Sequence, residues 1–479
     1  MTKIAIIGTG YVGVVSGLCL AKIGHNVICV DNDLEKIKRL QNGEIPIYEP
    51  GLKEILDEAV TKKTIVFTNN LSSAVGESQA IFIAVGTPQD EKTGNADLSF
   101  VFAAAKEIAK EIAKEISEAS EKENDQSNRL NSDYHKIIIT KSTVPVGTNL
   151  LIKEIIQNII PDANFSVVSN PEFLREGSAI TDFLEPDRIV IGVENEKSYK
   201  IMAEIYKYFE RKAPIVFTDI STAEMIKYAA NSFLAMKICF INEIADLCEK
   251  VGADVRKLSQ AIGMDSRIGS KFLNPGPGFG GSCFPKDILA LENIAKKNNI
   301  DLSLVSSTIK SNQHRKIKMA EKIISAIKEN IKENIKENSK NTKKQNVEDI
   351  SGKISGKTIA ILGLAFKGNT DDVRYSPALV IIKELLKKGI KINAYDSQAI
   401  TNSKKELGSN PAICYFDDAY QAIKNADLTV IATEWEEFRS LDLEKIKQLQ
   451  KTNLLIDLRN MIDAKQAKDL GFDYISVGQ

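Results

Sequence analysis

The first 31 residues hold the pattern that most restricts the fold of this chain. Residues 3–7 form a short apolar run, Gly8-Thr9-Gly10-Tyr11-Val12-Gly13 follows, residues 14–22 are helical in character, and the apolar run 26–30 ends at Asp31. Strand, G-x-G-x-x-G, helix, strand and acidic residue in this order predict the start of a dinucleotide-binding Rossmann unit.

Each part of this pattern has a physical role. Gly8 permits a tight turn, Gly10 lets a pyrophosphate approach the N–H groups at the helix start, and Gly13 allows close helix–strand packing. Asp31 is expected to accept hydrogen bonds from the adenosine ribose and to repel a 2′-phosphate, so NAD is favoured over NADP. The alternative is a plain strand–helix turn, for which the complete set of flanking elements would be a coincidence.

Strands and helices alternate through the rest of the first half, and the second half repeats the plan. There a strand at 357–362 meets Gly363, a helix at 376–388 follows, and the strand 391–395 ends at Asp396, but G-x-G-x-x-G is absent. The predicted fold is therefore α/β, with two Rossmann-like parallel-sheet domains joined by a central helical domain. Further strands of the first half are expected at residues 65–67, 80–85, 136–140 and 166–169.

The central helix, residues 221–250, is apolar on more than one face, and Ser221 and Glu224 form a capping-box pattern at its start. Such a helix is buried between domains or subunits, which predicts a homodimer formed through the central helices. The expected domains are 1–200 (NAD-binding), 201–310 (central) and 311–479 (C-terminal), with polar insertions at about 117–134 and about 327–352. Ile327, Ile331 and Ile335 recur at helical spacing, so a helix is expected to extend into the second insertion.

The composition narrows the class of protein. The chain has 479 residues, of which 43% are hydrophobic, and this favours a globular protein of two or three domains. Its formal net charge of −1 creates no overall electrostatic field that would attract nucleic acid or an anionic membrane surface. No apolar stretch is long enough to span a bilayer and no signal-peptide pattern opens the chain. The six cysteines lack paired spacing and the three histidines lack ligand spacing, so we expect a cytoplasmic protein without a metal centre.

A glycine-dense loop leads to the most reactive candidate, Cys283. Pro285 stands where the first turn of a helix would begin, so the thiol would lie at a helix N-terminus, with Lys286 nearby. The positive end of the helix dipole and a neighbouring cation both favour the nucleophilic thiolate. The glycines would let a ligand approach the backbone. The alternative is a buried structural cysteine.

Charged and polar residues at other positions form two pairs with helical spacing. Glu172 and Glu176 would share one face of a helical turn, and Lys227 and Asn231 would share one face of the central helix, where a lysine is costly without a partner. Solvated carboxylates and a lysine that reaches water are the alternatives. Three strand-end cations of the second half suit phosphate or carboxylate, or else lie on the surface: Lys367, Arg374 and Arg459.

These motifs together resemble the UDP-glucose/GDP-mannose dehydrogenase family. The resemblance spans nearly the whole chain apart from the two polar insertions, and the string Gly-Phe-Gly-Gly-Ser-Cys-Phe-Pro-Lys-Asp is highly specific. It implies an NAD-binding domain, a central dimerisation domain and a C-terminal UDP-sugar domain. The matching segments are 8–13, 46–52, 85–88, 141–145, 170–177, 227–231, 278–287 and 363–374.

The resemblance implies a four-electron oxidation of the C6 alcohol of UDP-glucose to a carboxylate, with two NAD. It implies that Cys283 forms a thiohemiacetal with the C6 aldehyde and that the second oxidation converts this intermediate to a thioester. The covalent bond would hold the reactive aldehyde between the two oxidations. It gives Glu172 the role of general base and Lys227 and Asn231 that of oxyanion partners. Asp287 would orient water or Lys227, with help from Thr143.

The resemblance also implies two sets of contacts. Those with NAD are Gly8, Gly10, Val12, Gly13, Asp31, Lys36, Thr87, Thr143, Glu176, Lys286 and Arg374. Those with the UDP-sugar are Glu172, Phe173, Leu174, Arg175, Glu176, Lys227, Asn231, Arg267, Phe272, Leu273, Asn274, Pro275, Gly276, Gly280, Lys367 and Arg459.

Three other functions stay open. The substrate could be GDP-mannose or a UDP-N-acetylhexosamine, since loop backbones read the base and the sugar 2-substituent. A simple hydroxyacid dehydrogenase would share the opening fold, need no cysteine and use one NAD per substrate. A non-catalytic nucleotide-sensing protein would not need Cys283 at all.

Overall fold

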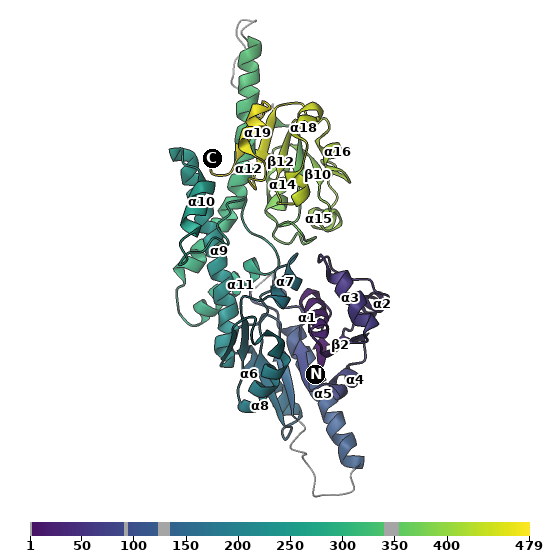
Figure 1. The fold of residues 1–479 in the computed structure, drawn as a ribbon. Coiled ribbons are helices and arrows are strands. Elements are labelled where there is room, and N and C mark those ends of the chain that lie inside the picture. The colour runs from purple at the N-terminus through teal and green to yellow at the C-terminus, as the bar shows by residue number, and fades with distance from the viewer. Residues whose placement is uncertain (1, 91–93, 123–134, 340–353) are drawn as a thin grey trace. The chain divides into compact units, whose positions relative to one another are not determined.

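The computed structural model describes residues 2–90, 94–122, 135–339 and 354–479. The chain forms two compact units, Met1–Ala230 and Asn231–Gln479, and their boundary falls inside the long helix α9 (Ile220–Val251). Figure 1 shows a sheet with helices in each unit, the first in purple to blue and the second in green to yellow. The predicted α/β class with two Rossmann-like sheets is confirmed.

The first unit contains an eight-stranded sheet in the order β3-β2-β1-β4-β5-β6-β7-β8. Neighbouring strands are parallel except for β6 and β7, which meet antiparallel at Ser169 and Gly192, so the expected parallel sheet holds for its first six strands. The strands are β1 Lys3–Ile7, β2 Asn26–Val30, β3 Ile65–Thr68, β4 Ala80–Ile83, β5 Lys136–Thr140, β6 Phe165–Ser169, β7 Ile189–Gly192 and β8 Ile215–Thr218.

Helices cover both faces of this sheet. Residues of α1, α2, α3, α7 and α8 pack into one apolar core and residues of α4, α5 and α6 into the other, as a doubly wound sheet requires. The helices are α1 Tyr11–Lys22, α2 Leu34–Gln41, α3 Leu52–Thr61, α4 Leu71–Glu77, α5 Ser99–Lys122, α6 Thr148–Ile159, α7 Ala179–Leu184 and α8 Glu196–Ile205.

The second unit contains a six-stranded sheet, wholly parallel, in the order β11-β10-β9-β12-β13-β14. This order matches that of the first six strands of the first sheet, which confirms the repeat expected from the sequence. The strands are β9 Thr358–Leu362, β10 Lys391–Tyr395, β11 Ile413–Phe416, β12 Leu428–Ile431, β13 Leu454–Asp457 and β14 Asp473–Ser476.

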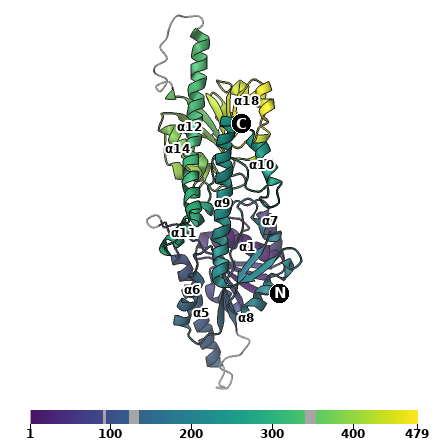
Figure 2. The same cartoon turned by 90° about the vertical axis from the view of Figure 1, so that its left-hand side faces the viewer.

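Long helices accompany this second sheet, and Figure 2 shows the second-unit part of α9 running beside α12. Helix α12 spans Ser303–Ser339 and includes Ile327, Ile331 and Ile335, as their spacing predicted. Residues 123–134 and 340–352 of the two insertions lie outside the described residues. The other helices are α10 Val255–Gly263, α11 Phe284–Lys297, α14 Pro377–Leu386, α15 Ile400–Leu407, α16 Ala419–Ile423, α17 Glu436–Arg439, α18 Leu443–Leu449 and α19 Ala464–Asp469.

The start of α9 differs from the expected capping box. Asp219 Oδ1 accepts the N–H of Thr222 at 2.8 Å and so caps the helix. The carboxylate of Glu224 instead accepts hydrogen bonds from the N–H groups of Gly147 and Asn149, at 2.7 and 2.9 Å, at the beginning of α6. The capping-box prediction was wrong because a tertiary partner, the α6 N-terminus, offers Glu224 two unpaired N–H groups.

Within the described ranges, no helix has both the length and the apolar character that crossing a membrane would require.

Candidate active site

The glycine turn after β1 is built as its sequence indicated. Gly8 has φ +101°, and a Cβ on it would lie 2.7 Å from the carbonyl oxygen of Ala84. A Cβ on Gly13 would lie 1.9 Å from the carbonyl oxygen of Gly8, so only glycine allows α1 to pack this closely. The two glycines bring the N-terminus of α1 to the carboxyl ends of β1 and β4.

The acidic residue at the end of β2 is held in place by its neighbours. Asp31 accepts hydrogen bonds from Thr9 N and Oγ1 at 2.8 and 2.7 Å, from Asp33 N at 3.0 Å and from Lys36 Nζ at 3.3 Å. Burial alone would raise the pKa of Asp31, but these bonds and the Lys36 charge outweigh it and leave the pKa below its usual value. Asp31 is thus an ionised acceptor beside the glycine turn.

The residues around this turn fit a dinucleotide. A Cβ at Gly10, the N-cap of α1, would meet nothing within 4 Å, so the backbone is open there. The first N–H groups of a helix lack intrahelical partners and attract anions, so a pyrophosphate is suited to this position. At the ends of β4 and β5, Thr87 Oγ1 donates to the carbonyl of Thr143 at 3.0 Å, which joins two of the expected cofactor residues.

Glu172 and Lys227 form a buried ion pair in the first unit. Lys227 Nζ lies 3.1 Å from Glu172 Oε1, and both side chains are at most 5% exposed. Glu172 Oε2 accepts the N–H of Leu174. The centre of the Phe173 ring lies 3.7 Å from the Arg188 guanidinium carbon and 5.2 Å from the Lys227 ammonium nitrogen. The costly lysine inferred from the sequence therefore has a carboxylate partner.

Glu172 and Glu176 do not share a helical turn. The chain from Asn170 to Arg175 is irregular and Glu176 lies in a turn, so the expected helical spacing was wrong. Pro171 restricts the residue before it to extended conformations, which explains why no helix starts at the end of β6. Arg175 binds Asp182 through its backbone N–H and its guanidinium, an ion pair that raises its pKa.

The sequence reasoning missed a second buried lysine, Lys141, which follows β5. Its Nζ donates to Asn170 Oδ1 at 3.0 Å and to the Tyr206 hydroxyl at 3.3 Å. Burial lowers the pKa of Lys141 to about 8. Its place within an apolar strand pattern was the available signal, the same one that singled out Lys227.

A buried carboxylate that sequence reasoning also left without a role links the glycine turn to the segment after Glu172. Glu49 accepts hydrogen bonds from the Tyr11 hydroxyl and from the N–H groups of Gly177 and Ala179, the latter two at 2.6 and 2.7 Å. Burial and then the bond to Glu49 raise the pKa of Tyr11. The segment that carries Glu176 is thereby fixed to the first turn of α1.

Cys283 lies at the beginning of a helix in the second unit, as predicted. It is the N-cap of α11, Pro285 lies in the first turn, and the residue is half-buried. Four of the other cysteines are buried and Cys414 is exposed. One turn on, the N–H of Asp287 donates to the Cys283 carbonyl at 2.9 Å.

Asp287 joins two of the expected site residues. Its side chain is 1% exposed, and its two oxygens accept hydrogen bonds from Asn231 Nδ2 and Lys286 Nζ, each at 2.6 Å. The carboxylate therefore orients the Asn231 amide. Lys227 and Asn231 lie one turn apart on α9, as their spacing predicted.

The glycines before Cys283 serve packing within the protein. A Cβ on Gly278 would lie 2.8 Å from Asn312 Oδ1, one on Gly280 would lie 2.5 Å from the Tyr375 carbonyl, and one on Gly281 would lie 2.7 Å from the Phe366 ring. At these three positions protein atoms fill the space that a side chain would need, and the expected approach of a ligand to this backbone stays a prediction. Both Phe272 and Tyr375 have left-handed φ values, 66° and 54°, which are costly for aromatic residues.

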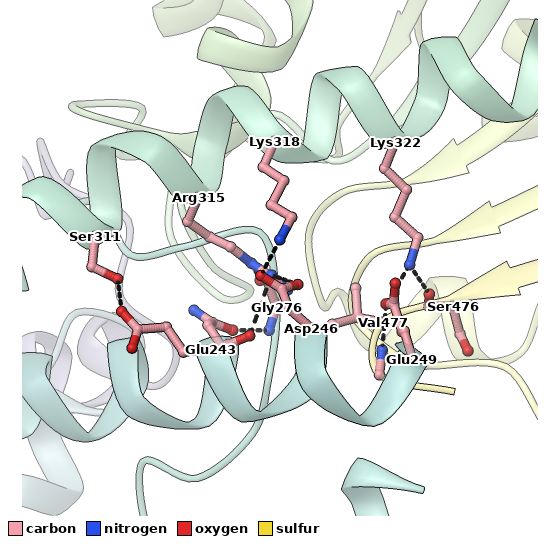
Figure 3. A network of polar contacts seen from close by, with 12 residues as sticks. Glu243, Asp246, Glu249, Gly276, Ser311, Arg315, Lys318, Lys322, Ser476 and Val477 are labelled. Atoms are coloured by element: carbon pink, nitrogen blue, oxygen red, sulfur yellow. Dashed lines mark hydrogen bonds and ion pairs between the residues drawn. The ribbon is translucent and has the colours of Figure 1, made fainter. Parts of the chain in front are cut away.

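Buried side chains of α12 hold the backbone of this loop. Asn312 donates to and accepts from the Phe279 peptide groups, and Arg315 Nε donates to the Gly276 carbonyl at 2.9 Å. The Gly276 N–H donates to Asn242 Oδ1 at 2.8 Å. Figure 3 shows the part of this network around Arg315, where the carboxylates of Asp246 and Glu249 on α9 bind the side chains of Arg315, Lys318 and Lys322 on α12.

The expected cations of the second unit have partners of their own. Arg459 donates to the carbonyls of Ala432 and Phe366 at 3.0 and 2.9 Å, and a Cβ on Gly276 would lie 3.2 Å from its Nη1. Arg374 pairs with Asp372 and remains 61% exposed, and Arg267 pairs with Asp265 and remains 86% exposed. The remaining expected residues of this unit are Lys367, Leu273, Asn274 and Pro275, of which Leu273 and Pro275 are buried and Asn274 is exposed.

Comparison with known proteins gives consistent matches over the whole chain. Residues 2–210, 221–314 and 360–464 match the NAD binding, central and UDP binding domains of one dehydrogenase family. The chain is 45% identical over 480 residues to a UDP-glucose 6-dehydrogenase of Rhizobium meliloti (100% of this chain, 99% of the relative) and 44% identical to one of Bacillus subtilis (100% and 94%). A UDP-glucose dehydrogenase structure from Pyrobaculum islandicum aligns with a TM-score of 0.82 and 32% identity over 99% of this chain and 97% of that one.

Proposed function

The chain belongs to the UDP-glucose/GDP-mannose dehydrogenase family, and we propose that it oxidises the C6 alcohol of UDP-glucose to the carboxylate of UDP-glucuronate with two NAD. The observation that carries the proposal is the half-buried Cys283 at the N-terminus of α11, one turn before the buried Asp287–Asn231 pair. A thiol in this position is suited to covalent capture of an aldehyde.

Bound NAD would accept a hydride in each of the two oxidations, and the chain supplies the groups that bind it. The open backbone at Gly10 suits the pyrophosphate, and the ionised Asp31 suits the ribose hydroxyls and disfavours a 2′-phosphate. Thr87, Thr143 and Lys36 line the same carboxyl ends of the strands, where ligands of open α/β sheets bind.

Different polar residues form the covalent intermediates, accept the proton and stabilise negative charge. Cys283 adds to the C6 aldehyde as a thiohemiacetal, and after the second oxidation it carries the acid as a thioester. Glu172 accepts a proton from the attacking water, and the Lys227 ammonium and the Asn231 amide stabilise negative charge on oxygen. Support comes from the Glu172–Lys227 ion pair and from the hydrogen bond by which Asp287 fixes Asn231.

Counting NADH tests this proposal. With limiting UDP-glucose and excess NAD, the wild-type protein is expected to release two NADH per sugar, because the oxidation transfers four electrons. Cys283→Ser is expected to give at most slow, partial oxidation without turnover to the acid, since the thioester cannot form. The exposed Cys414 supplies the control, Cys414→Ser, which should retain full activity.

Other results would change the proposal. Full activity of Cys283→Ser would remove the covalent mechanism, and a single NADH per substrate would indicate a simple alcohol oxidation. GDP-mannose and UDP-N-acetylglucosamine assayed in parallel would replace UDP-glucose as the substrate if either gave the higher kcat/KM.

The proposal includes a homodimer formed through α9. Phe233, Phe240, Leu247 and Val251 are exposed on this helix, and the half-buried Met236 and Ile244 complete a spacing of three and four residues. This set, the α9 stripe, has the spacing by which two helices pack against each other. A second copy of the same helix is a self-complementary partner for it. A cytoplasmic location is also proposed, supported by six cysteines that form no disulfide bond in the described residues.

A further inference from the structure

Lys141 is a buried cation without a paired carboxylate. It is 6% exposed, and its ammonium lies about 6 Å from the ring centres of Phe183 and Tyr206. Its two hydrogen-bond partners, Asn170 Oδ1 and the Tyr206 hydroxyl, are both neutral. No carboxylate of the described residues forms an ion pair with it. A charge buried in this way costs stability, so its presence indicates a role other than stabilising the fold.

The partner of Lys141 determines where the Glu172 segment begins. Asn170 is 0% exposed, its N–H donates to the Thr140 carbonyl at 2.9 Å, and its Nδ2 donates to the Val190 carbonyl at 2.8 Å. Its Oδ1 receives both Lys141 and Tyr206. Asn170 is thus fixed on three sides, two residues before Glu172.

Lys141 is also coupled by charge to the ion pair beyond Asn170. Burial lowers its pKa to about 8, the Glu172 charge opposes that shift, and the Lys227 charge adds to it. The titratable groups that face Lys141 are therefore Glu172, Lys227 of α9 and Tyr206. Two cations and one carboxylate share a site screened from water, where charges interact strongly.

We propose that Lys141 is a positioning residue for the hydrolysis of the thioester: it fixes Glu172 through Asn170 and supplies a second positive charge beside the Glu172–Lys227 pair. The inference rests on the proposed function. In this step the water oxygen bonds to the acyl carbon, its proton passes to Glu172, the C–S bond breaks and Cys283 leaves as a thiolate. Lys141 touches none of the reacting atoms and acts through Asn170 and through its charge.

Lys141→Met tests this role by separating hydrolysis from oxidation. We expect kcat to fall by about tenfold or more, with little change in KM for UDP-glucose or NAD. The first turnover should still release two NADH per site as a burst, followed by a slow steady state, because only the later hydrolysis is impaired. Tyr206→Phe, which keeps the ammonium but removes one bond to Asn170, should lower kcat by a smaller factor.

The thermal stability of Lys141→Met should not fall with its kcat. The folded pKa of Lys141, about 8, lies below its ordinary value of 10.5, so its proton opposes folding below pH 8 and this cost disappears as the pH rises from 8 to 10.5. Lys141→Met should therefore have an equal or higher Tm than wild type at pH 7, and this advantage should shrink by pH 10. A merely structural lysine would give a lower Tm instead.

Lys136 provides a matched control at the other end of β5. It is also buried, but it donates to the carbonyls of Val75 and Ser78 and pairs with Glu115. Lys136→Met should lower Tm and leave kcat unchanged. An unchanged kcat in Lys141→Met, or a joint loss of Tm and of the NADH burst, would overturn the inference. If the wild type itself gave no NADH from UDP-glucose, the proposed function would fail instead.

Discussion

At the scale of single residues, glycines in this protein permit close packing between backbone segments, both near to each other and distant in the chain. A Cβ on Gly13 would clash with the carbonyl of Gly8, and a Cβ on Gly280 would clash with the carbonyl of Tyr375. Lys316 binds that same Tyr375 carbonyl at 2.7 Å, and burial lowers the pKa of Lys316 to about 8. The loop before Cys283 is therefore held by contacts that leave no space for a side chain.

Gly280→Ala tests this packing. The new Cβ would meet backbone, which cannot move aside as a side chain can, so we expect the free energy of unfolding to fall by about 1–3 kcal/mol in urea titration. Gly76→Ala is the control, because its Cβ would meet nothing within 4 Å in α4 and alanine favours helix. Equal stability of the two variants would contradict the expectation.

At the scale of elements, carboxylates from one segment cap helices or bind backbone N–H groups of another. Glu224 of α9 is 2% exposed and binds the N-terminus of α6, while Glu49 binds the backbone N–H groups of Gly177 and Ala179 at the start of α7. Each carboxylate satisfies N–H groups that the helix itself leaves unpaired. The loops that carry Thr143 and Glu176 obtain their positions in this way.

Glu224→Ala tests the cap on α6. It leaves the buried Asn149 N–H group and the half-buried Gly147 N–H group without an acceptor, so we expect a loss of about 1–3 kcal/mol in the free energy of unfolding, measured by urea titration. Ser221→Ala should change it by about 0.5 kcal/mol or less, since Asp219 is the N-cap of α9. A large effect of Ser221→Ala would instead favour the capping box.

At the scale of the whole molecule, the α9 stripe is the surface through which we propose that two copies of the chain associate. Large exposed apolar side chains at helix-packing spacing are unusual on a monomer. Helix α9 also carries Lys227, Asn231 and the two carboxylates that bind α12 side chains, Asp246 and Glu249. Dimerisation through α9 would therefore stabilise the helix on which all four of these residues lie.

Phe240→Glu tests the dimer. The new charge at the centre of the α9 stripe would have to be desolvated when two copies associate. We therefore expect the Kd of the dimer, measured by sedimentation, to rise by about tenfold or more. Val66→Glu, at an exposed position of the edge strand β3, should leave the dimer intact. A wild-type protein that sediments as a monomer would exclude this interface.

Features that depend on the local order of residues could be predicted from the sequence. The glycine turn with Asp31, the helix that begins at Cys283 and the one-turn spacing of Lys227 and Asn231 follow from short-range periodicity and turn chemistry. The repeat of alternating strands and helices in the two halves was also predicted, whereas the order of the strands within each sheet was not. The family motifs added the chemistry of the expected site residues.

The pairing of polar groups could not be predicted, because it depends on the folded arrangement of the chain. Glu224 of α9 binds the N-terminus of α6, and Lys141 donates hydrogen bonds to Asn170 and Tyr206. The glycines of the Cys283 loop pack against Asn312, Tyr375 and Phe366. These partners are tens of residues apart in the chain, and no periodicity connects them. They are selected because buried donors and acceptors must be paired, a condition that acts only once the chain has folded.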